Sequence, residues 1–112
     1  MKNTQIKYKL WIEKDGDIII GMGRDKLLRE IENTGSIKKA SEKVGISYKK
    51  ALEYIKAMEK RTGQKIVETF RGGKEKGGAR LTPFAKKLLQ DFEHILKNFE
   101  NLKQKLENEK YI

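Results

Sequence analysis

The chain lacks several features that would place it in other protein classes. Its 112 residues contain no cysteine, which excludes disulfide bonds and thiolate metal sites. No segment approaches the run of about 18 apolar residues that spans a membrane. The first residues, MKNTQIKYKLWIEKDGD, also lack the apolar stretch of a signal peptide. We therefore expect a cytoplasmic protein with no membrane partner.

The residues give no sign of catalytic or cofactor chemistry either. His94 is the only histidine, and no cluster of Asp, His or Cys accompanies it. Gly72 and Gly77 have the spacing of a phosphate-binding loop, but Gly78 and Ala79 follow where that loop needs Lys and Ser or Thr. We expect no enzyme, no metal site and no cofactor.

Positive charge, in contrast, is abundant and concentrated. The net charge is +10, and residues 36–80 hold thirteen Lys or Arg against five acidic residues. Such a balance suits nucleic acid, an anionic membrane or simple solubility. Only 37% of the residues are hydrophobic. A core this small fits one domain that gains stability by oligomerisation.

The first 35 residues predict a β-hairpin followed by a short helix. Apolar and polar side chains alternate between residues 6 and 13, and Asp15-Gly16 is a strong hairpin turn signal. We therefore predict a hairpin over residues 6–20. Residues 24–34 then carry apolar side chains at helical spacing and stop at Gly35.

Residues 36–62 have the pattern of a helix-turn-helix. Ser36 and Ser47 are good N-cap residues, and each precedes a segment with an apolar stripe at helical spacing. Gly45 ends the first segment, so a turn of about three residues joins the two helices.

Residues 65–82 predict a second hairpin, placed where a winged helix carries its wing. The strand patterns KIVETF and ARLT flank four glycines within seven residues, namely Gly72, Gly73, Gly77 and Gly78. Glycine permits turns with positive φ and lets a backbone lie close to a surface. The alternative is a solvated loop with incidental charge.

Residues 83–112 predict one long helix, opened by Thr82 and Pro83. Apolar residues recur at alternating spacings of three and four, which is the heptad pattern of a helix that pairs with another. The expected dimer interface is Leu88, Phe92, Ile95, Phe99, Leu102 and Leu106. The fold class is thus mainly α with a small amount of β: a winged helix-turn-helix domain over residues 1–82 and a dimerisation helix over residues 83–112.

This arrangement predicts a DNA-binding surface. The second helix of the motif would enter the major groove with its N-terminus first. Base readout is expected from Ser47, Tyr48, Lys49, Lys50, Glu53 and Tyr54. Phosphate and wing contacts are expected from Ser36, Lys38, Lys39, Arg71, Gly72, Gly73, Lys74, Lys76, Gly77, Gly78 and Arg80. Whether the wing follows the backbone or enters the minor groove stays open.

Several segments occur in a characteristic order: Thr34-Gly35-Ser36-Ile37, Gly45-Ile46-Ser47-Tyr48-Lys49, the glycine-rich wing and Leu81-Thr82. Through these segments, residues 6 to 90 closely resemble the N-terminal domain of ModE-type molybdate-dependent transcription regulators, and more distantly that of LysR-type regulators. The resemblance implies a prokaryotic homodimer on a palindromic operator. The 112 residues include no counterpart of the family's oxyanion-binding domain, so we expect no molybdate or tungstate binding in this chain.

We therefore predict that the chain is a sequence-specific transcription regulator that binds double-stranded DNA as a homodimer. Two alternatives use the same features. An architectural protein could coat DNA without sequence preference, and a protein-interaction module could use the heptad helix while its basic face is merely solvated. The operator, the target genes, the direction of regulation and any effector are not given by the residues.

Overall fold

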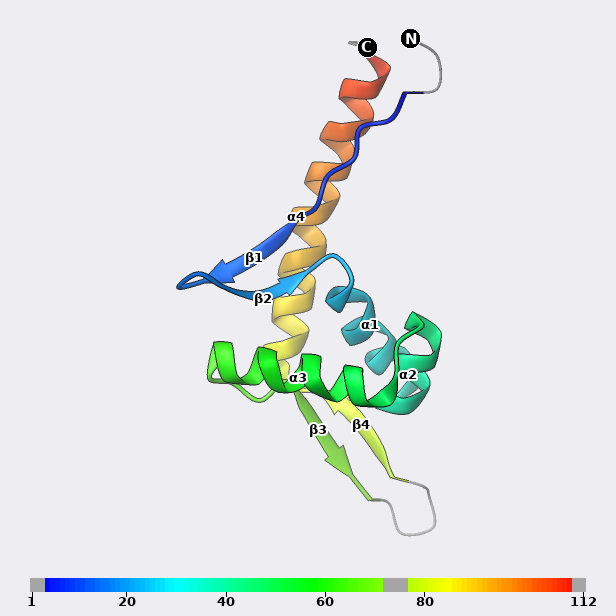
Figure 1. Cartoon of the computed structure of the whole chain (residues 1–112), viewed down its shortest axis with the longest axis vertical. Helices are drawn as coiled ribbons and strands as arrows, with labels where there is room; N and C mark the ends of the chain where they lie inside the picture. Colours follow the sequence, from blue (N-terminus) through cyan, green and yellow to red (C-terminus); the bar gives the residue numbers. More distant parts are fainter. Residues whose placement is uncertain (1–3, 72–76, 110–112) are drawn as a thin grey trace.

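The computed structural model describes residues 4–71 and 77–109 of the chain. Helices dominate this part, and Figure 1 shows their arrangement. The elements are β1 (Trp11–Lys14), β2 (Asp17–Gly21), α1 (Arg24–Thr34), α2 (Ile37–Val44), α3 (Tyr48–Thr62), β3 (Val67–Phe70), β4 (Gly78–Leu81) and α4 (Pro83–Asn108). The strands form two separate antiparallel hairpins. The predicted class, a mainly α winged helix-turn-helix with an N-terminal hairpin and a long C-terminal helix, is confirmed.

The N-terminal hairpin has the predicted turn but a shorter first strand than predicted. Asp15 and Gly16 have φ angles of 51° and 86°, the two positive values of a type I′ turn. The strand begins at Trp11 rather than near Ile6. Its partner β2 ends at Gly21, opposite Trp11, so the ladder stops there.

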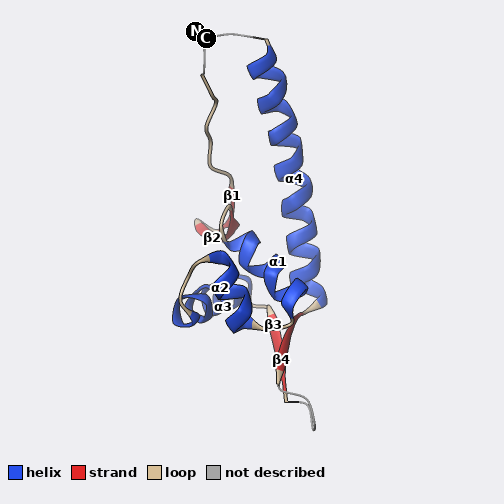
Figure 2. Ribbon diagram, turned by 90° about the vertical axis from the view of Figure 1, so that its right-hand side faces the viewer, coloured by secondary structure: helices blue, strands red, loops and turns tan. Residues whose placement is uncertain are grey.

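Residues 4–10 instead form an extended segment beside the outer half of α4 (Figures 1 and 2). The Ile6 backbone N–H donates to Glu107 Oε2 at 2.9 Å, and the Tyr8 hydroxyl donates to Glu100. Partial burial, together with the hydrogen bond to Glu100 and the negative charge of that residue, raises the pKa of Tyr8 to about 12. The apolar alternation that predicted a strand here therefore serves packing against a helix.

Capping residues begin and end the helices of the motif as the sequence predicts. Ser36 Oγ accepts a hydrogen bond from the Lys39 backbone N–H at 3.1 Å, and Ser47 Oγ accepts one from Lys50 at 3.0 Å. Gly45 ends α2 with a φ of 85°. Residues 45–47 thus connect α2 to α3, which is the spacing of a helix-turn-helix.

The wing hairpin is fixed to the helical part at its base. The Ala79 backbone N–H donates to the carbonyl of Gly35 at 2.8 Å, which ties β4 to the connection between α1 and α2. The buried hydroxyl of Thr82 donates to the Lys65 carbonyl at 2.7 Å and caps α4. These hydrogen bonds join β4 to the connection between α1 and α2, and the residue after β4 to the segment before β3.

The core lies where the three helices α1–α3 meet β4 and the first half of α4. Its buried apolar residues are Ile20, Leu27, Leu28, Ile31, Ile37, Ala40, Ala51, Ile55, Met58, Ile66, Val67, Ala79, Leu81, Ala85, Leu89 and Phe92. The predicted assignment of Phe92 to a dimer interface is therefore wrong. Its side chain is fully buried in the core of its own chain.

Helix α4 is half core helix and half projecting helix (Figure 2). Its buried residues end at Phe92. Further along, Ile95, Phe99 and Leu102 are 36%, 45% and 49% exposed. The radius of gyration is 16.7 Å, whereas a compact chain of this length would have about 13 Å. The projecting half of α4 accounts for this elongation.

Candidate nucleic-acid interface

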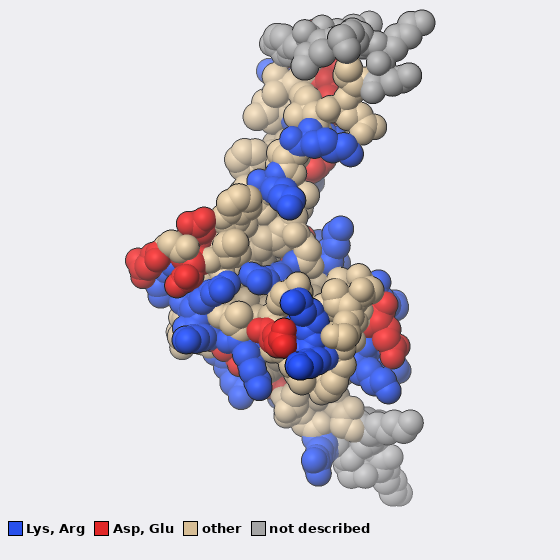
Figure 3. Space-filling view, viewed as in Figure 1, with Lys and Arg blue, Asp and Glu red and all other residues tan. Residues whose placement is uncertain are grey.

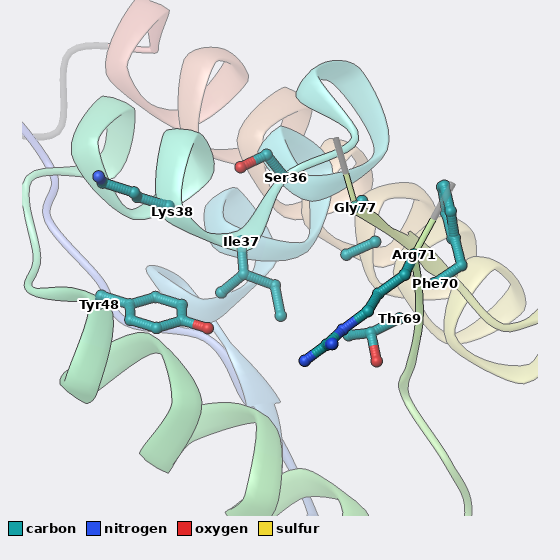
Figure 4. Close-up of a pocket in the computed structure, with 10 residues that line it drawn as sticks. Ser36, Ile37, Lys38, Tyr48, Thr69, Phe70, Arg71 and Gly77 are labelled. Atoms are coloured by element: carbon teal, nitrogen blue, oxygen red, sulfur yellow. The ribbon is translucent and has the colours of Figure 1, made fainter. Parts of the chain in front are cut away.

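A cleft of about 440 Å³ lies between the start of α2, the start of α3 and the wing strands. Figure 4 shows that the Arg71 side chain extends into it between Ile37 and Thr69, with its guanidinium end toward the Tyr48 hydroxyl. We call this space the wing cleft. It combines a guanidinium, a phenol hydroxyl and the first turn of a helix, three groups that bind phosphate oxygens.

The first turn of α2 contributes backbone donors and charge to the wing cleft. Ser36 Oγ pairs with the Lys39 N–H. The N–H groups of the two residues between them have no partner within the helix, because an α-helix leaves its first N–H groups unpaired. Lys38 and Lys39 are both exposed. The positive end of the helix dipole and these two cations favour an anion at this position.

The outward face of α3 carries a row of charged side chains opposite the stripe that packs in the core. The row consists of Lys49, Glu53, Lys56 and Lys60, all of them exposed. Figure 3 shows basic side chains gathered across the middle of the molecule, over α3 and beside the N-terminal hairpin. Lys49 and Glu53 were predicted from the sequence, whereas Lys56 and Lys60 were not. Spacings of four and three residues along the same helix would have found them.

Tyr48 and Ser47 stand at the start of α3, where the row meets the wing cleft. The Tyr48 side chain is exposed and lines the cleft. Ser47 is exposed and caps the helix. These two predicted residues and Lys49 therefore lie together at one end of the surface.

Lys50 and Tyr54 lie on the opposite edge of α3, beside the N-terminal hairpin and α1. The guanidinium of Arg24 lies 4.7 Å from the centre of the Tyr54 ring, and Lys50 Nζ lies 5.6 Å from it. Lys50 Nζ is also 4.0 Å from Glu53 Oε2. The structure thus places Tyr54, which is half-buried beneath Arg24, with Lys50 and apart from Ser47, Tyr48 and Lys49.

Part of the predicted wing surface can be placed and part cannot. Gly72, Gly73, Lys74 and Lys76 lie outside the described residues. A Cβ atom on Gly77 would lie 2.8 Å from the backbone carbonyl oxygen of Phe70. Gly77 is therefore needed for the two wing strands to approach each other, whatever the wing touches.

Arg80 is the predicted wing cation that the structure pairs with an acidic residue. Its Nε lies 3.2 Å from Glu68 Oε2 on the neighbouring strand, and its guanidinium lies 5.7 Å from the centre of the Phe70 ring. Both charged side chains are exposed. A phosphate contact by Arg80 would have to compete with this ion pair. Phe70 and Thr69, which line the wing cleft, were not predicted.

The sequence profile described as "Bacterial regulatory helix-turn-helix protein, lysR family" matches residues 26–86, more than half of the chain. This chain belongs to that family. The match includes α2, α3, both wing strands and the start of α4. It is a family of DNA-binding transcription regulators, and the resemblance found in the sequence is confirmed.

Individual members of the family with a ModE name align with the same region. The chain is 36% identical to the transcriptional regulator ModE of Haemophilus influenzae over 109 residues, which cover 97% of this chain and 42% of that protein. It is 38% identical to ModE of Yersinia pestis over 84 residues, or 71% of this chain and 32% of the relative. The DNA-binding transcriptional dual regulator ModE of Escherichia coli K12 is 40% identical over 67 residues, with coverages of 60% and 26%. The chain therefore spans less than half the length of these relatives.

The projecting half of α4 adds an apolar surface to this family domain. Ile95, Phe99 and Leu102 are exposed, while Leu88 and Leu106 are half-buried. The predicted heptad residues therefore divide between the chain's own core and an apolar surface that the described residues leave partly exposed, with the Phe99 ring 6.3 Å from the ring of Tyr8.

Other kinds of site have no support within residues 4–71 and 77–109. No three His, Cys, Asp or Glu side chains gather there in a way that could hold a metal ion. No helix in this part of the chain combines the length and apolar character needed to cross a membrane.

Proposed function

We propose that this chain binds double-stranded DNA as a sequence-specific transcription regulator. The proposal rests mainly on one observation: the wing cleft and the charged row on α3 form one continuous surface. The wing cleft, with Arg71 and the first turn of α2, opens next to the N-terminal end of the charged row on α3. Membership of a family of regulatory helix-turn-helix proteins also supports DNA binding.

Helix α3 is the proposed reader of base edges. Lys49 is exposed at its first turn and can donate to guanine O6 and N7, and Glu53 can accept from cytosine N4. Ser47, Tyr48, Lys50 and Tyr54 complete the proposed readout set. Arg24 lies over the Tyr54 ring, so a base contact by Tyr54 would have to displace that guanidinium.

Phosphate contacts are proposed for the cations and backbone groups around α3. Lys38, Lys39 and Ser36 belong to the start of α2, and Arg71 to the wing cleft. The wing residues Gly72, Gly73, Lys74, Lys76, Gly77, Gly78 and Arg80 complete the proposed set. These contacts would fix the register of α3 without reading sequence.

We further propose that two copies pair through the projecting half of α4 on a palindromic operator. Support comes from the exposed Ile95, Phe99 and Leu102, with the half-buried Leu106 on the same half of the helix. Leu88 completes the proposed set, although it lies in the core half of α4 and packs partly against the chain's own core. The two recognition helices would then read half-sites about 34 Å apart, or one turn of DNA. This assigns residues 1–82 to DNA binding and 83–112 to dimerisation.

In-vitro selection of bound DNA from a random duplex library tests the proposal. We expect a palindromic motif bound at least about a thousandfold more tightly than random duplex. Selection without any palindrome would contradict the dimeric operator. Affinities within a few-fold for all sequences would favour the architectural alternative.

The salt dependence of binding separates DNA recognition from the protein-interaction alternative. Several phosphate contacts give a steep fall in affinity with salt, whereas a protein–protein contact through α4 would change little. The 112 residues include no counterpart of the oxyanion-binding domain, so we expect binding by this chain to be the same with and without added molybdate or tungstate. A requirement for either oxyanion would show that the chain contains an effector site of that kind.

A further inference from the structure

We propose that a second cavity, on the other edge of α3, binds a small planar aromatic carboxylate and lets it control the DNA-binding surface. This cavity of about 450 Å³ lies between the N-terminal hairpin, the first residue of α1 and the connection between α2 and α3. We call it the hairpin cavity. It shares no lining residue with the wing cleft.

The walls of the hairpin cavity are aromatic and apolar. They include Trp11, Met22, Val44, Ile46 and Tyr54. Trp11 and Met22 are 46% and 45% exposed, so two large apolar side chains border an open space. Its volume lies within the range of about 300–1,000 Å³ typical of small-molecule sites. Flat rings of Trp and Tyr suit a flat aromatic ligand.

The charges of the hairpin cavity select for an anion. Lys9 and Arg24 both line it. Within residues 4–71 and 77–109, no ion pair joins either cation to an acidic side chain. The Arg24 guanidinium instead lies 4.7 Å from the centre of the Tyr54 ring. A guanidinium can form two parallel hydrogen bonds with a carboxylate. The contact of Arg24 with the Tyr54 ring does not provide such hydrogen bonds.

Tyr54 connects this cavity to the proposed DNA surface. Arg24 and Lys50 both lie over its ring, and Lys50 is one of the proposed readout residues. A carboxylate bound to Arg24 would draw the guanidinium away from the ring and leave Tyr54 and Lys50 free to rearrange. A ring packed on Val44 and Ile46 would also contact the connection between α2 and α3. This coupling rests on the proposed DNA-binding function, whereas ligand binding itself does not.

Ligand binding can be followed at Trp11, the only tryptophan of the chain. We would titrate 1-naphthoate and record the NMR shift of the Trp11 indole N–H, with the neutral 1-naphthamide as the matched probe. For a ligand of this size we expect a dissociation constant of about 1 mM or lower. The amide should bind at least about tenfold more weakly, because it cannot pair with a cation. Equal binding of the two probes, or no saturable shift with naphthoate, would overturn the site.

Variants of α1 test the role of Arg24. Arg24→Gln should weaken naphthoate binding about tenfold or more, while Arg24→Lys should retain part of it. Lys26→Gln is the matched control, since Lys26 is exposed on the same helix and does not line the cavity. Retained binding in Arg24→Gln, or an equal loss in Lys26→Gln, would contradict the assignment.

Regulation is tested separately by measuring operator affinity with and without naphthoate. We expect at least about a fivefold change in the wild type, the lower end of typical coupling between sites, and none in Arg24→Gln. Saturable naphthoate binding with unchanged operator affinity would overturn the coupling and leave the site. A chain that bound naphthoate but no DNA would instead overturn the proposed function.

Discussion

Removing the two cations at the wing cleft tests the proposed DNA-binding mode directly. Lys38 and Arg71 are exposed and line the cleft from opposite sides. No ion pair neutralises either of them within the described residues. The double change Lys38→Ala with Arg71→Ala should therefore remove two phosphate contacts while leaving the core intact.

The magnitude follows from counterion release. Each lost contact lowers the slope of log affinity against log salt concentration by about 0.9, so the double variant should lose about 1.8. If the wild type and the double variant bind equally at 1 M salt, this difference in slope makes the variant bind roughly 60-fold more weakly than the wild type at about 0.1 M salt. Specific and random duplexes should weaken by the same factor, because phosphate contacts carry no sequence information.

Fluorescence anisotropy with a labelled duplex at several salt concentrations measures both quantities. Lys97→Ala with Lys105→Ala is the matched control. It removes the same charge from exposed positions on α4, away from the cleft. We expect little change of slope there, since interactions longer than about 10 Å are screened at this salt concentration. An unchanged slope in the cleft variant, or an equal change in the control, would refute the placement of DNA in the wing cleft.

Three further variants address readout, the wing and the dimer. Lys49→Ala should reduce the ratio of specific to random binding, since each good base contact gives about 1–3 kcal/mol of discrimination; competition with random duplex measures this ratio. Glu68→Gln should release Arg80 from its ion pair and tighten binding to all duplexes, and an unchanged anisotropy titration would show that Arg80 makes no phosphate contact. Leu102→Glu should weaken pairing by about 2 kcal/mol for the two copies together. Sedimentation should show this as a shift to monomer that Gln104→Glu, on the outer face of α4, does not cause.

The local features of the fold could be predicted because short-range chemistry decides them. Asp15-Gly16 dictates its turn, since few other residue pairs accept two positive φ angles. Ser36, Ser47 and Gly45 similarly mark helix ends through hydrogen bonds and backbone angles that involve only nearby residues. The helix-turn-helix and the wing strands follow from such signals and were predicted correctly.

Longer-range features were harder to predict because one pattern fits several partners. The alternation that starts at residue 6 shows that one face is covered, but not whether a strand or a helix covers it. Here α4 does, through Glu100 and Glu107. In the same way, a heptad repeat does not distinguish a seam that faces another chain from one that faces its own core. Phe92 takes the second role.

The candidate site shows a similar division. Residues on the outward face of α3 follow from helical spacing, so Lys49 and Glu53 were predicted. The contacts that hold the predicted residues Tyr54 and Arg80 in other interactions come from residues far apart in the sequence. Arg24 reaches Tyr54 across thirty positions, and Glu68 pairs with Arg80 across the wing hairpin. Neither pairing could be derived without knowing how the elements pack.

The position of the wing base has a consequence for how DNA would be bound. The hydrogen bond from Ala79 to Gly35 links β4 to the residue just before the N-cap of α2. A Cβ on Gly78 would lie 2.8 Å from the Phe70 ring and 3.0 Å from the same Gly35 carbonyl oxygen, so a side chain there would force these neighbours to shift. Strand β4 of the wing and the first turn of α2 are thus already joined before any ligand arrives. A surface preorganised in this way loses little conformational entropy on binding, so its contacts contribute more fully to affinity.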